Sequence, residues 1–329
     1  MISLFSGAGG FDLGLEASQV METLLCVELE NSYFQTLKIN QGKEFKGVKF
    51  LEKAELINAS VLDEKTQARI SEITGSLGDW IMVGGPPCQS FSSIGKREFL
   101  GDPRGELTPF FFKLVKEFRP RFFIFENVPM VGQKAGEGLR HEIFKILDAS
   151  NYHYCQSVIN LADYGCYTKR KRFFIIGDRE SAINFPSPTH SSTEDIFLKM
   201  WKRSADALIN ISDPYKENDL THHDPIFHTE SVIERFQSLK LGEYDRKRHR
   251  SKLDPEQPAP TLVAGGNSGY VHHIHWHGRE LTSRESAALH GFPLDFDFHG
   301  SKLDVAKQIV NSVPIEFGEF IGSFLHSRI

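Results

Sequence analysis

The sequence predicts an α/β fold with a mostly parallel sheet and a second, smaller, irregular domain. In the first half of the chain, short apolar runs alternate with helical patterns, which is typical of parallel strands covered by helices on both faces. From residue 179 to residue 278, short polar segments dominate and turn-forming residues interrupt any long periodic pattern. We therefore predict a large domain made of residues 1–178 and 279–329, with a small domain, residues 179–278, inserted into it.

Each predicted strand of the large domain is an apolar run that ends at a turn or at a polar residue. The runs cover residues 2–5, 24–27, 80–83, 122–125 and 172–177. Helical patterns cover residues 108–118, 139–148 and 281–292, and the segment from Val305 onward is predicted as a strand followed by a helix. Open parallel sheets bind ligands beyond the carboxyl ends of their strands. The residues that follow strand ends are therefore the candidates for function.

The composition excludes several classes of protein. The chain has 329 residues, 40% of them hydrophobic and 25% charged, which is ordinary for a globular protein and excludes a disordered chain, a collagen or a coiled coil. No apolar run reaches the roughly 18–20 residues that cross a bilayer, and the N-terminus lacks a secretory signal. Four cysteines without a CxxC pair indicate a reducing, cytosolic compartment. Because the net charge is −5, a nucleic acid would have to meet a local basic face.

A glycine-rich turn, Phe5 to Gly10, follows the first predicted strand. Glycines let the backbone approach a ligand closely, and the helix that follows presents its N-terminus to a negative group. Glu28 ends the next strand, where a carboxylate can accept hydrogen bonds from ribose hydroxyls, as in nucleotide-binding sheets. A turn that binds nothing and a solvated glutamate are the alternatives.

A cysteine follows an unusually rigid stretch, residues 84–87, and precedes a polar segment. This arrangement fits Cys88 as a thiolate nucleophile beside a movable flap. Glu126 ends the run 122–125 and could act as an acid if burial raises its pKa, although a partly exposed loop glutamate is the alternative. Strand alternation points Arg170 and Arg172 the same way, and arginine suits a base carbonyl or a phosphate unless the run is simply solvated.

Taken together, these residues resemble the cytosine-C5 DNA methyltransferase family of bacterial restriction–modification type. The motifs occur in the family's order along the chain, which makes a chance match very rare. They are FSGAGGFDLG (5–14), GGPPCQSFSSIGK (84–96), DPRGEL (102–107), ENV (126–128), RKR (170–172), APTL (259–262), RELTSRESAALHGFP (279–293) and IVNSVP (309–314). The resemblance implies a Rossmann-like methyltransferase sheet in the large domain and target recognition by the small domain.

The resemblance implies an enzyme that flips a cytosine out of the duplex, because the C5 edge and the ring face are inaccessible within the base stack. Cys88 would attack C6, and Glu126 would contact N3 and help to protonate it. Arg170 and Arg172 would orient the cytosine and its phosphate. C5 would accept the methyl group of S-adenosyl-L-methionine, which leaves S-adenosyl-L-homocysteine, and a base would then remove the C5 proton as Cys88 departs.

The resemblance also implies which residues hold the cofactor and the DNA. Phe5 would lie against the adenine, Glu28 would bind the ribose, and Asn311 would hold the methionine end. The full cofactor set is Phe5, Ser6, Gly7, Gly9, Gly10, Glu28, Val61, Pro86, Asn311 and Ser312. The segment after the cysteine would close on DNA through Gln89, Ser92, Lys96 and Arg97. A basic run in the small domain, Arg246, Lys247, Arg248 and Arg250, fits phosphate contacts, with a solvated charge run as the alternative.

Several positions depart from the family pattern. Residues 167–168 are Tyr-Thr instead of Pro-Gln, Val310 replaces a glycine, Ser312 replaces an alanine and His290 replaces a glutamine. Ser60 stands where an acidic residue is expected, which puts the adenine contact in question. The nucleophile, the acid and the two arginines are all retained, so we expect activity.

The same residues leave three alternative functions. A tRNA cytosine methyltransferase is the alternative enzyme, although the sizeable segment between the RKR and APTL motifs favours DNA. A silent DNA- or cofactor-binding module would be free to lose Cys88 and Glu126, and a glycine-turn oxidoreductase leaves PPCQ and ENV unexplained. Histidines 273, 275 and 277 would share one face of a strand and could ligate a metal, but the expected chemistry needs none, so a packed or DNA-facing strand is expected instead.

The resemblance finally implies the setting in which the protein acts. We expect a monomer, in the cytoplasm of a bacterium or encoded by a phage, that acts on double-stranded DNA. We also expect functional pairing with a restriction endonuclease, and no membrane partner.

Overall fold

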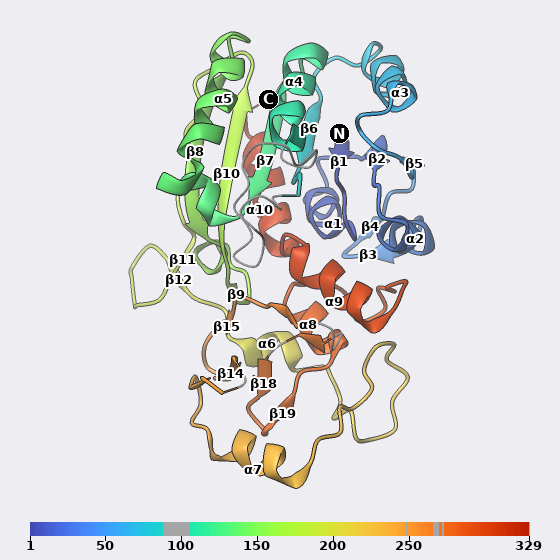
Figure 1. The fold of residues 1–329 in the computed structure, drawn as a ribbon. Coiled ribbons are helices and arrows are strands. Elements are labelled where there is room, and N and C mark those ends of the chain that lie inside the picture. The colour runs from blue at the N-terminus through green and yellow to red at the C-terminus, as the bar shows by residue number, and fades with distance from the viewer. Residues whose placement is uncertain (88–105, 248, 266–269, 272, 329) are drawn as a thin grey trace.

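The computed structural model describes residues 1–87, 106–247, 249–265, 270–271 and 273–328. They form an upper part built on one large sheet and a lower part of short strands and helices (Figure 1). The chain leaves the upper part after the last strand of the large sheet, builds the lower part, and returns to the upper part with its final helix (Figure 1).

The large sheet has seven strands in the order β5-β2-β1-β6-β7-β10-β8. They are β1 (Ile2–Leu4), β2 (Leu25–Val27), β5 (Glu55–Ile57), β6 (Ile81–Gly84), β7 (Phe122–Asn127), β8 (His153–Asn160) and β10 (Lys171–Asp178). All neighbouring pairs are parallel except those of β10, which runs antiparallel to β7 and β8. The predicted mostly parallel, Rossmann-like sheet is confirmed. Because β10 is reversed, its first residues lie at the edge where β7 ends.

Helices cover both faces of the large sheet, as a buried parallel sheet requires. They are α1 (Gly10–Ala17), α2 (Asn31–Asn40), α3 (Glu64–Thr74), α4 (Leu107–Phe118), α5 (Glu137–Asp148) and α10 (Ile315–His326). Along β7 the side chains alternate: Phe123 packs into a core cluster with α4 and α5, whereas Ile124 packs into a second cluster with α10. Helices α1 and α10 lie in close contact because Gly14 and Gly318 have no side chains, and a Cβ on Gly14 would lie 2.8 Å from the Gly318 Cα.

The lower part contains a four-stranded sheet of order β13-β14-β18-β19. Its strands are β13 (Tyr244–Asp245), β14 (Arg250–Lys252), β18 (His273–His275) and β19 (Arg279–Glu280). Helix α7 (Glu230–Ser238) packs on this sheet through Phe236, which contacts Ile274. The buried Lys252 ammonium donates to the carbonyls of Phe236, Gln237 and Leu239, and so satisfies the C-terminal end of α7.

A short strand pair joins the two parts beside Arg170. β9 (Thr168–Lys169) pairs with β15 (Ala259–Pro260), so the chain before the arginines is hydrogen-bonded to the APTL motif. The remaining strands and α-helices of the described residues are β3 (Glu44–Phe45), β4 (Val48–Lys49), β11 (His190–Ser191), β12 (Lys199–Met200), β16 (Ala264–Gly265), β17 (Tyr270–Val271), α6 (Ser204–Leu208), α8 (Ser283–Ala288) and α9 (Lys302–Asn311).

The C-terminal segment corrects one prediction and shortens another. The strand predicted after Val305 is wrong, because residues 302–311 form helix α9. Its buried Val305 and Ile309 are spaced four residues apart, as on one face of a helix, and Ser301 and Asp304 form a capping box at its start. The helix predicted over 281–292 is confined to α8, since the chain turns at Gly291, where φ is 79°.

The division of the chain at 178/179 and 278/279 stays a prediction. Ile183 packs into the core of the large sheet, and β19 belongs to the small sheet, so we propose that both boundaries lie some residues later. Among the described residues, no helix is both long enough and apolar enough to cross a membrane.

Candidate active site

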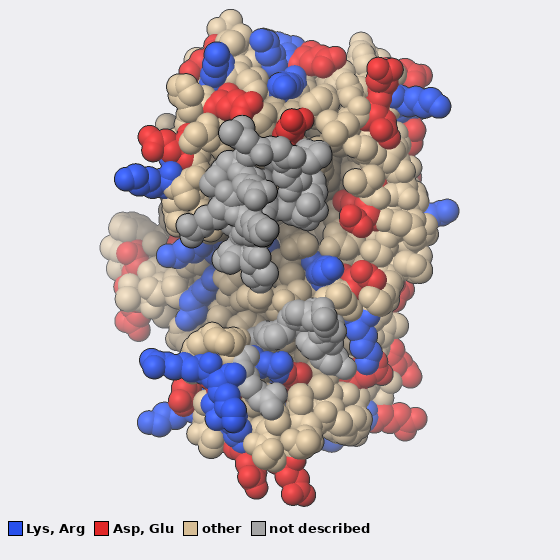
Figure 2. Space-filling model, viewed as in Figure 1, with Lys and Arg blue, Asp and Glu red and all other residues tan. Residues whose placement is uncertain are grey.

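The candidate side chains gather along the carboxyl edge of the large sheet. In sheet order, β5 is followed by Ser60, β2 by Glu28, β1 by the glycine turn and β6 by Pro86. Glu126 lies at the end of β7, and Arg172 lies at the start of the reversed β10. The surface is hollowed between the upper and lower parts on the face shown in Figure 2, and Lys and Arg side chains gather along the rim of this hollow.

The glycine turn is held open by backbone conformations that glycine tolerates best. Phe5, Gly7 and Gly9 all have positive φ, at 57°, 60° and 79°. The buried Glu28 carboxylate fixes the turn, because it accepts hydrogen bonds from the backbone N–H groups of Gly7 and Glu30, each at 2.8 Å. Burial raises the pKa of Glu28, and these N–H groups oppose that rise. Each carboxylate oxygen keeps a further lone pair for a hydroxyl.

The end of helix α9 lies directly against this turn. A Cβ on Gly10 would collide with the Ser312 hydroxyl, so glycine is required for the close approach. The neighbouring Asn311 is exposed, and its amide donates to the Tyr33 hydroxyl of α2 at 3.4 Å. The structure thus places Ser312 against the glycine turn, with Asn311 next to it in the chain, and their contact with the cofactor stays a prediction. Val61, by contrast, is 3% exposed and packs into the core.

Two apolar side chains that the sequence analysis missed lie at the same edge. Leu29 is 61% exposed and directly follows Glu28, and Leu62 is 45% exposed and directly follows Val61. A large apolar side chain left in solvent just beyond a strand end is suited to cover a flat, apolar ring. Their positions in the sequence, directly after the predicted cofactor residues Glu28 and Val61, could have identified them.

The acid and the arginines form one cluster. The Arg172 Nε lies 3.0 Å from the Glu126 Oε1, and both side chains are 13% exposed. Burial raises the pKa of Glu126, while the charges of Arg172 and Arg170 lower it. Arg170 is fully buried, and its Nε and Nη1 have no hydrogen-bond partner among the described residues. The Asn127 amide donates to the Pro86 carbonyl at 3.1 Å, which ties the GGPP stretch to β7.

Six predicted site residues lie outside the described residues. They are Cys88, Gln89, Ser92, Lys96, Arg97 and Arg248. The assignments of the nucleophile and of the closing segment therefore remain predictions from the sequence.

The whole chain matches one protein family. Residues 1–326 match the family described as C-5 cytosine-specific DNA methylase. The chain belongs to this family. It is therefore a DNA (cytosine-5-)-methyltransferase, an enzyme that transfers a methyl group from S-adenosylmethionine to C5 of cytosine in DNA.

The methyltransferase is similar to other proteins over nearly its full length. The Type II methyltransferase M1.HphI of Haemophilus parahaemolyticus is 31% identical over 95% of this chain and 82% of its own. M.NgoPII of Neisseria gonorrhoeae is 30% identical over 100% of this chain and 96% of its own. A crystal structure of a DNA modification methyltransferase encoded within a prophage (E. coli) shares 27% identity, 99% and 98% coverage and a TM-score of 0.75. The S. pombe Dnmt2 methyltransferase, at 18% identity, 99% and 98% coverage and a TM-score of 0.65, shares the fold.

The residues at the sheet edge fit S-adenosylmethionine. The backbone at Gly7 is open, because a Cβ there would meet no described atom within 4 Å, so a ligand can come close to the main chain. A buried carboxylate, Glu28, is placed to accept from ribose hydroxyls, and exposed Leu29 and Leu62 can cover an adenine. When bound, the cofactor supplies an electrophilic methyl group at this edge.

The basic run of this methyltransferase splits into two environments. Arg246 and Lys247 are exposed, as a phosphate contact requires. Arg250 instead forms an ion pair with the buried Glu280, which His228 also approaches at 3.3 Å. The Arg250 charge is thus directed into the small domain. The sequence of the basic run does not predict this difference between Arg250 and its neighbours.

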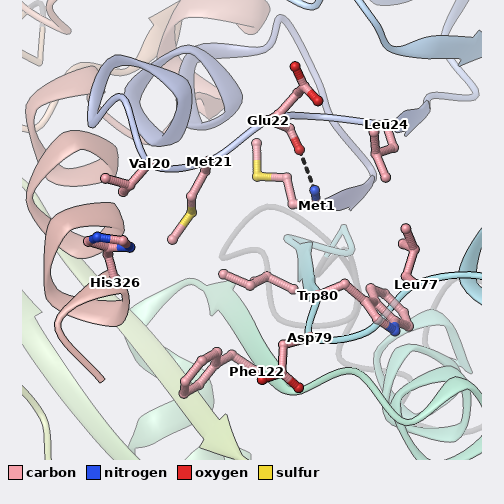
Figure 3. Close-up of a pocket in the computed structure, with 11 residues that line it drawn as sticks. Met1, Val20, Met21, Glu22, Leu24, Leu77, Asp79, Trp80, Phe122 and His326 are labelled. Atoms are coloured by element: carbon pink, nitrogen blue, oxygen red, sulfur yellow. Dashed lines mark hydrogen bonds between the residues drawn. The ribbon is translucent and has the colours of Figure 1, made fainter. Parts of the chain in front are cut away.

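A small cavity of about 220 Å³ lies at the opposite, amino edge of the sheet (Figure 3). It is lined mainly by apolar side chains, among them Met21, Leu24 and Trp80. Two of its polar residues already have partners: the Met1 ammonium donates to the Glu22 carbonyl, and the Glu22 carboxylate pairs with Lys53 at 2.7 Å. The edge where parallel strands begin is also not where such sheets bind ligands.

Of the three histidines singled out in the sequence, His273 and His275 are buried, whereas His277 is exposed. His273 Nε2 lies 3.1 Å from the Thr261 carbonyl oxygen, and burial lowers the pKa of His275 to about 2. Within the part of the chain that the structure describes, no group of three or more His, Cys, Asp or Glu side chains is arranged to hold a metal ion.

Proposed function

We propose that this methyltransferase acts on a specific short sequence in double-stranded DNA, through a covalent bond between Cys88 and C6 of a flipped cytosine. The observation that carries the proposal is the placement of Glu126 and Arg172 beside Pro86, at the edge that also bears the glycine turn. Cys88 follows Pro86 by two positions in the sequence. C5 of cytosine is a poor nucleophile until a group adds at C6, so a thiol, an acid and groups that orient the ring are what the reaction needs.

In the proposed reaction Glu126 is the acid. Its raised pKa favours a protonated carboxyl, which hydrogen-bonds N3 of the cytosine and delivers a proton as the Cys88 sulfur bonds to C6. Electron density then develops at C5, which takes the methyl group. A base removes the C5 proton, and the electron pair of that C–H bond forms the C5–C6 double bond and expels the Cys88 thiolate. N3 returns its proton to Glu126, and the aromatic ring is restored. Arg170 and Arg172 orient the ring and its phosphate, and the unpartnered nitrogens of Arg170 suit such a contact.

The proposed cofactor site uses both side chains and backbone. Phe5 lies against the adenine with Leu29 and Leu62, Glu28 accepts from the ribose, and Asn311 holds the methionine end. The glycine turn supplies Ser6, Gly7, Gly9 and Gly10. Ser312 at the end of α9, Val61 after β5 and Pro86 after β6 complete the site. Because Val61 is buried, its contribution is proposed to come from its backbone.

The proposed DNA contacts and setting follow from the relatives and the surface. Arg246 and Lys247 are proposed to contact phosphates, and the segment from Gln89 to about Arg104 is proposed to close on the target. Two similar proteins are Type II methyltransferases, which supports a partnership with a restriction endonuclease in a bacterial or phage setting, with action in the cytoplasm. We propose that the protein acts as a monomer.

The test is to express the chain in a host that lacks 5-methylcytosine and to sequence the host DNA at base resolution for that mark. The same experiment is run with Cys88→Ala. We expect methylation at one short motif in the first strain and none in the second. A mark that persists in Cys88→Ala would exclude Cys88 as the nucleophile, and absence of the mark from both strains would favour an RNA substrate or a silent binding module.

A further inference from the structure

Helices α2 and α9 run antiparallel and are joined by two polar contacts on one face of each helix. The Thr36 hydroxyl donates to the Gln308 side-chain oxygen at 2.6 Å, and both side chains are buried. Three residues earlier on α2 and three residues later on α9, the Asn311 amide donates to the Tyr33 hydroxyl at 3.4 Å. Residues three apart lie on the same helix face, so the second contact is the next step toward the carboxyl edge of the sheet.

The contact between Tyr33 and Asn311 lies close to two parts of the proposed cofactor site, the ribose ligand Glu28 and the glycine turn. Tyr33 is five residues beyond Glu28, and the negative charge of Glu28 acts on the Tyr33 hydroxyl. On the other helix, Asn311 precedes Ser312, whose hydroxyl lies against Gly10. Tyr33 is therefore near the proposed ribose ligand Glu28, and through Asn311 it is next to the residue that packs against the glycine turn.

The hydrogen-bonding capacity left in this pair is complementary to an amino acid. Because Asn311 Nδ2 donates to the Tyr33 oxygen, the phenol O–H remains able to donate, and Asn311 Oδ1 remains able to accept. Burial and the nearby charges of Glu28, Glu30 and Asp304 raise the pKa of Tyr33 to about 12, so the phenol keeps its proton at neutral pH. A donor and an acceptor side by side match a carboxylate and an ammonium group.

We propose that Tyr33 and Asn311 form the subsite for the amino-acid end of S-adenosylmethionine, with the Tyr33 hydroxyl donating to its carboxylate. The proposal rests on the cofactor site proposed above, to which it adds Tyr33. A contact that served only to hold α2 against α9 would duplicate the buried pair of Thr36 and Gln308, and it would not need to lie at the open edge.

The test is equilibrium binding by calorimetry, without DNA, with two ligands on the full chain. S-adenosylhomocysteine carries the amino-acid end, and 5′-methylthioadenosine lacks it. For Tyr33→Phe we expect the dissociation constant of S-adenosylhomocysteine to rise about tenfold, as for loss of one hydrogen bond to a charged group, and that of 5′-methylthioadenosine to stay within about twofold.

Two control variants separate this subsite from a structural role. Thr36→Val removes the buried contact, so it should lower the melting temperature while leaving the ratio of the two dissociation constants unchanged. Tyr154→Phe removes a phenol that bonds Asp148 on the far side of the sheet, and both ligands should bind as to the original chain. Equal losses for both ligands in Tyr33→Phe, or no loss, would overturn the proposal. A parent chain that binds neither ligand would instead overturn the proposed cofactor site, and this subsite with it.

Discussion

Glu28 and Glu126 are both largely buried carboxylates at the same edge of the sheet, yet their partners differ in kind. Glu28 accepts two hydrogen bonds from the backbone of Gly7 and Glu30. Glu126 faces the side chain of Arg172. In both residues burial raises the pKa, but the opposing influence comes from fixed amides in the first and from mobile guanidinium charge in the second.

The difference indicates two tasks for one functional group. Backbone amides cannot leave, so Glu28 is suited to hold a turn and to present lone pairs in one geometry. A guanidinium can move toward a substrate, so Glu126 is suited to change its partner and its protonation during a reaction. The cofactor half of the site is thus preorganised through the main chain, whereas the base half is built from ionisable side chains. The predictions below test this contrast.

The largest effect is expected for Glu126→Gln. The amide keeps the shape but cannot deliver the proton, so the single-turnover rate of methyl transfer should fall by about a thousandfold, within the usual range for a general acid. Binding of S-adenosylhomocysteine should be unchanged, because the cofactor half is separate. Glu142→Gln, an exposed change on α5, is the matched control. A Glu126→Gln variant that keeps the original rate would exclude the acid role.

Removal of the guanidinium should change both the rate and its pH dependence. Arg172→Gln should lower the maximal rate by about a hundredfold, as for loss of one oriented donor at a charged site. Because Arg172 lowers the pKa of Glu126, its removal lets burial raise that pKa further. The rate depends on protonated Glu126 and falls as pH rises through its pKa, so the basic limb of the rate profile should move to higher pH. Arg172→Lys, which keeps the charge, should leave the limb close to its original place; a shift to lower pH would contradict the mechanism.

A smaller effect, on binding alone, is expected for Glu28→Gln. Glutamine offers one acceptor oxygen in place of two, so the N–H of Gly7 or of Glu30 loses its partner. An unsatisfied buried donor costs about 1–3 kcal/mol, so S-adenosylhomocysteine should bind about tenfold more weakly or worse by calorimetry. Glu30→Gln changes only an exposed side chain and keeps the backbone N–H that donates to Glu28, so this variant should bind S-adenosylhomocysteine normally. Equal behaviour of the two variants would show that the Glu28 carboxylate does not organise the turn.

The strands and the chemical groups could be read from the sequence because their signals are local. The five apolar runs are all found in the large sheet, and the residues of the glycine turn, Glu126 and the arginines meet at one edge because strand ends meet there. The edge strands β5 and β8 were missed, since their side chains are largely half-buried and carry no continuous apolar run. The strand predicted after Val305 failed because β-branched residues on a buried helix face resemble a strand.

The parts that the sequence could not show depend on distant partners. Tyr33 meets Asn311 across 278 positions, and no local pattern marks either residue as half of a pair. Arg250 looks like its neighbours in a basic run, but the buried Glu280, two strands away in the small sheet, determines where its charge is directed. Such pairings are set by tertiary packing. They give neighbouring residues of one sequence run, such as Arg246 and Arg250, different environments.

The smallest effect is expected on DNA binding by the small domain. There the same contrast separates Arg250, which has a fixed internal partner, from Arg246 and Lys247, which are exposed and can bind phosphate. Exposed Arg246 and Lys247 can release counterions from phosphates, so Arg246→Gln and Lys247→Gln should each lower the slope of log affinity for DNA against log salt concentration by about one. Fluorescence anisotropy with a duplex that carries the methylated motif, over a series of salt concentrations, measures this slope. Arg250→Gln should leave the slope unchanged and lower the melting temperature instead, because it leaves the buried Glu280 without its guanidinium partner. If Arg250→Gln reduced the slope as much as Arg246→Gln, the ion pair with Glu280 would have to open on DNA, and the three basic residues would act as one phosphate-binding run.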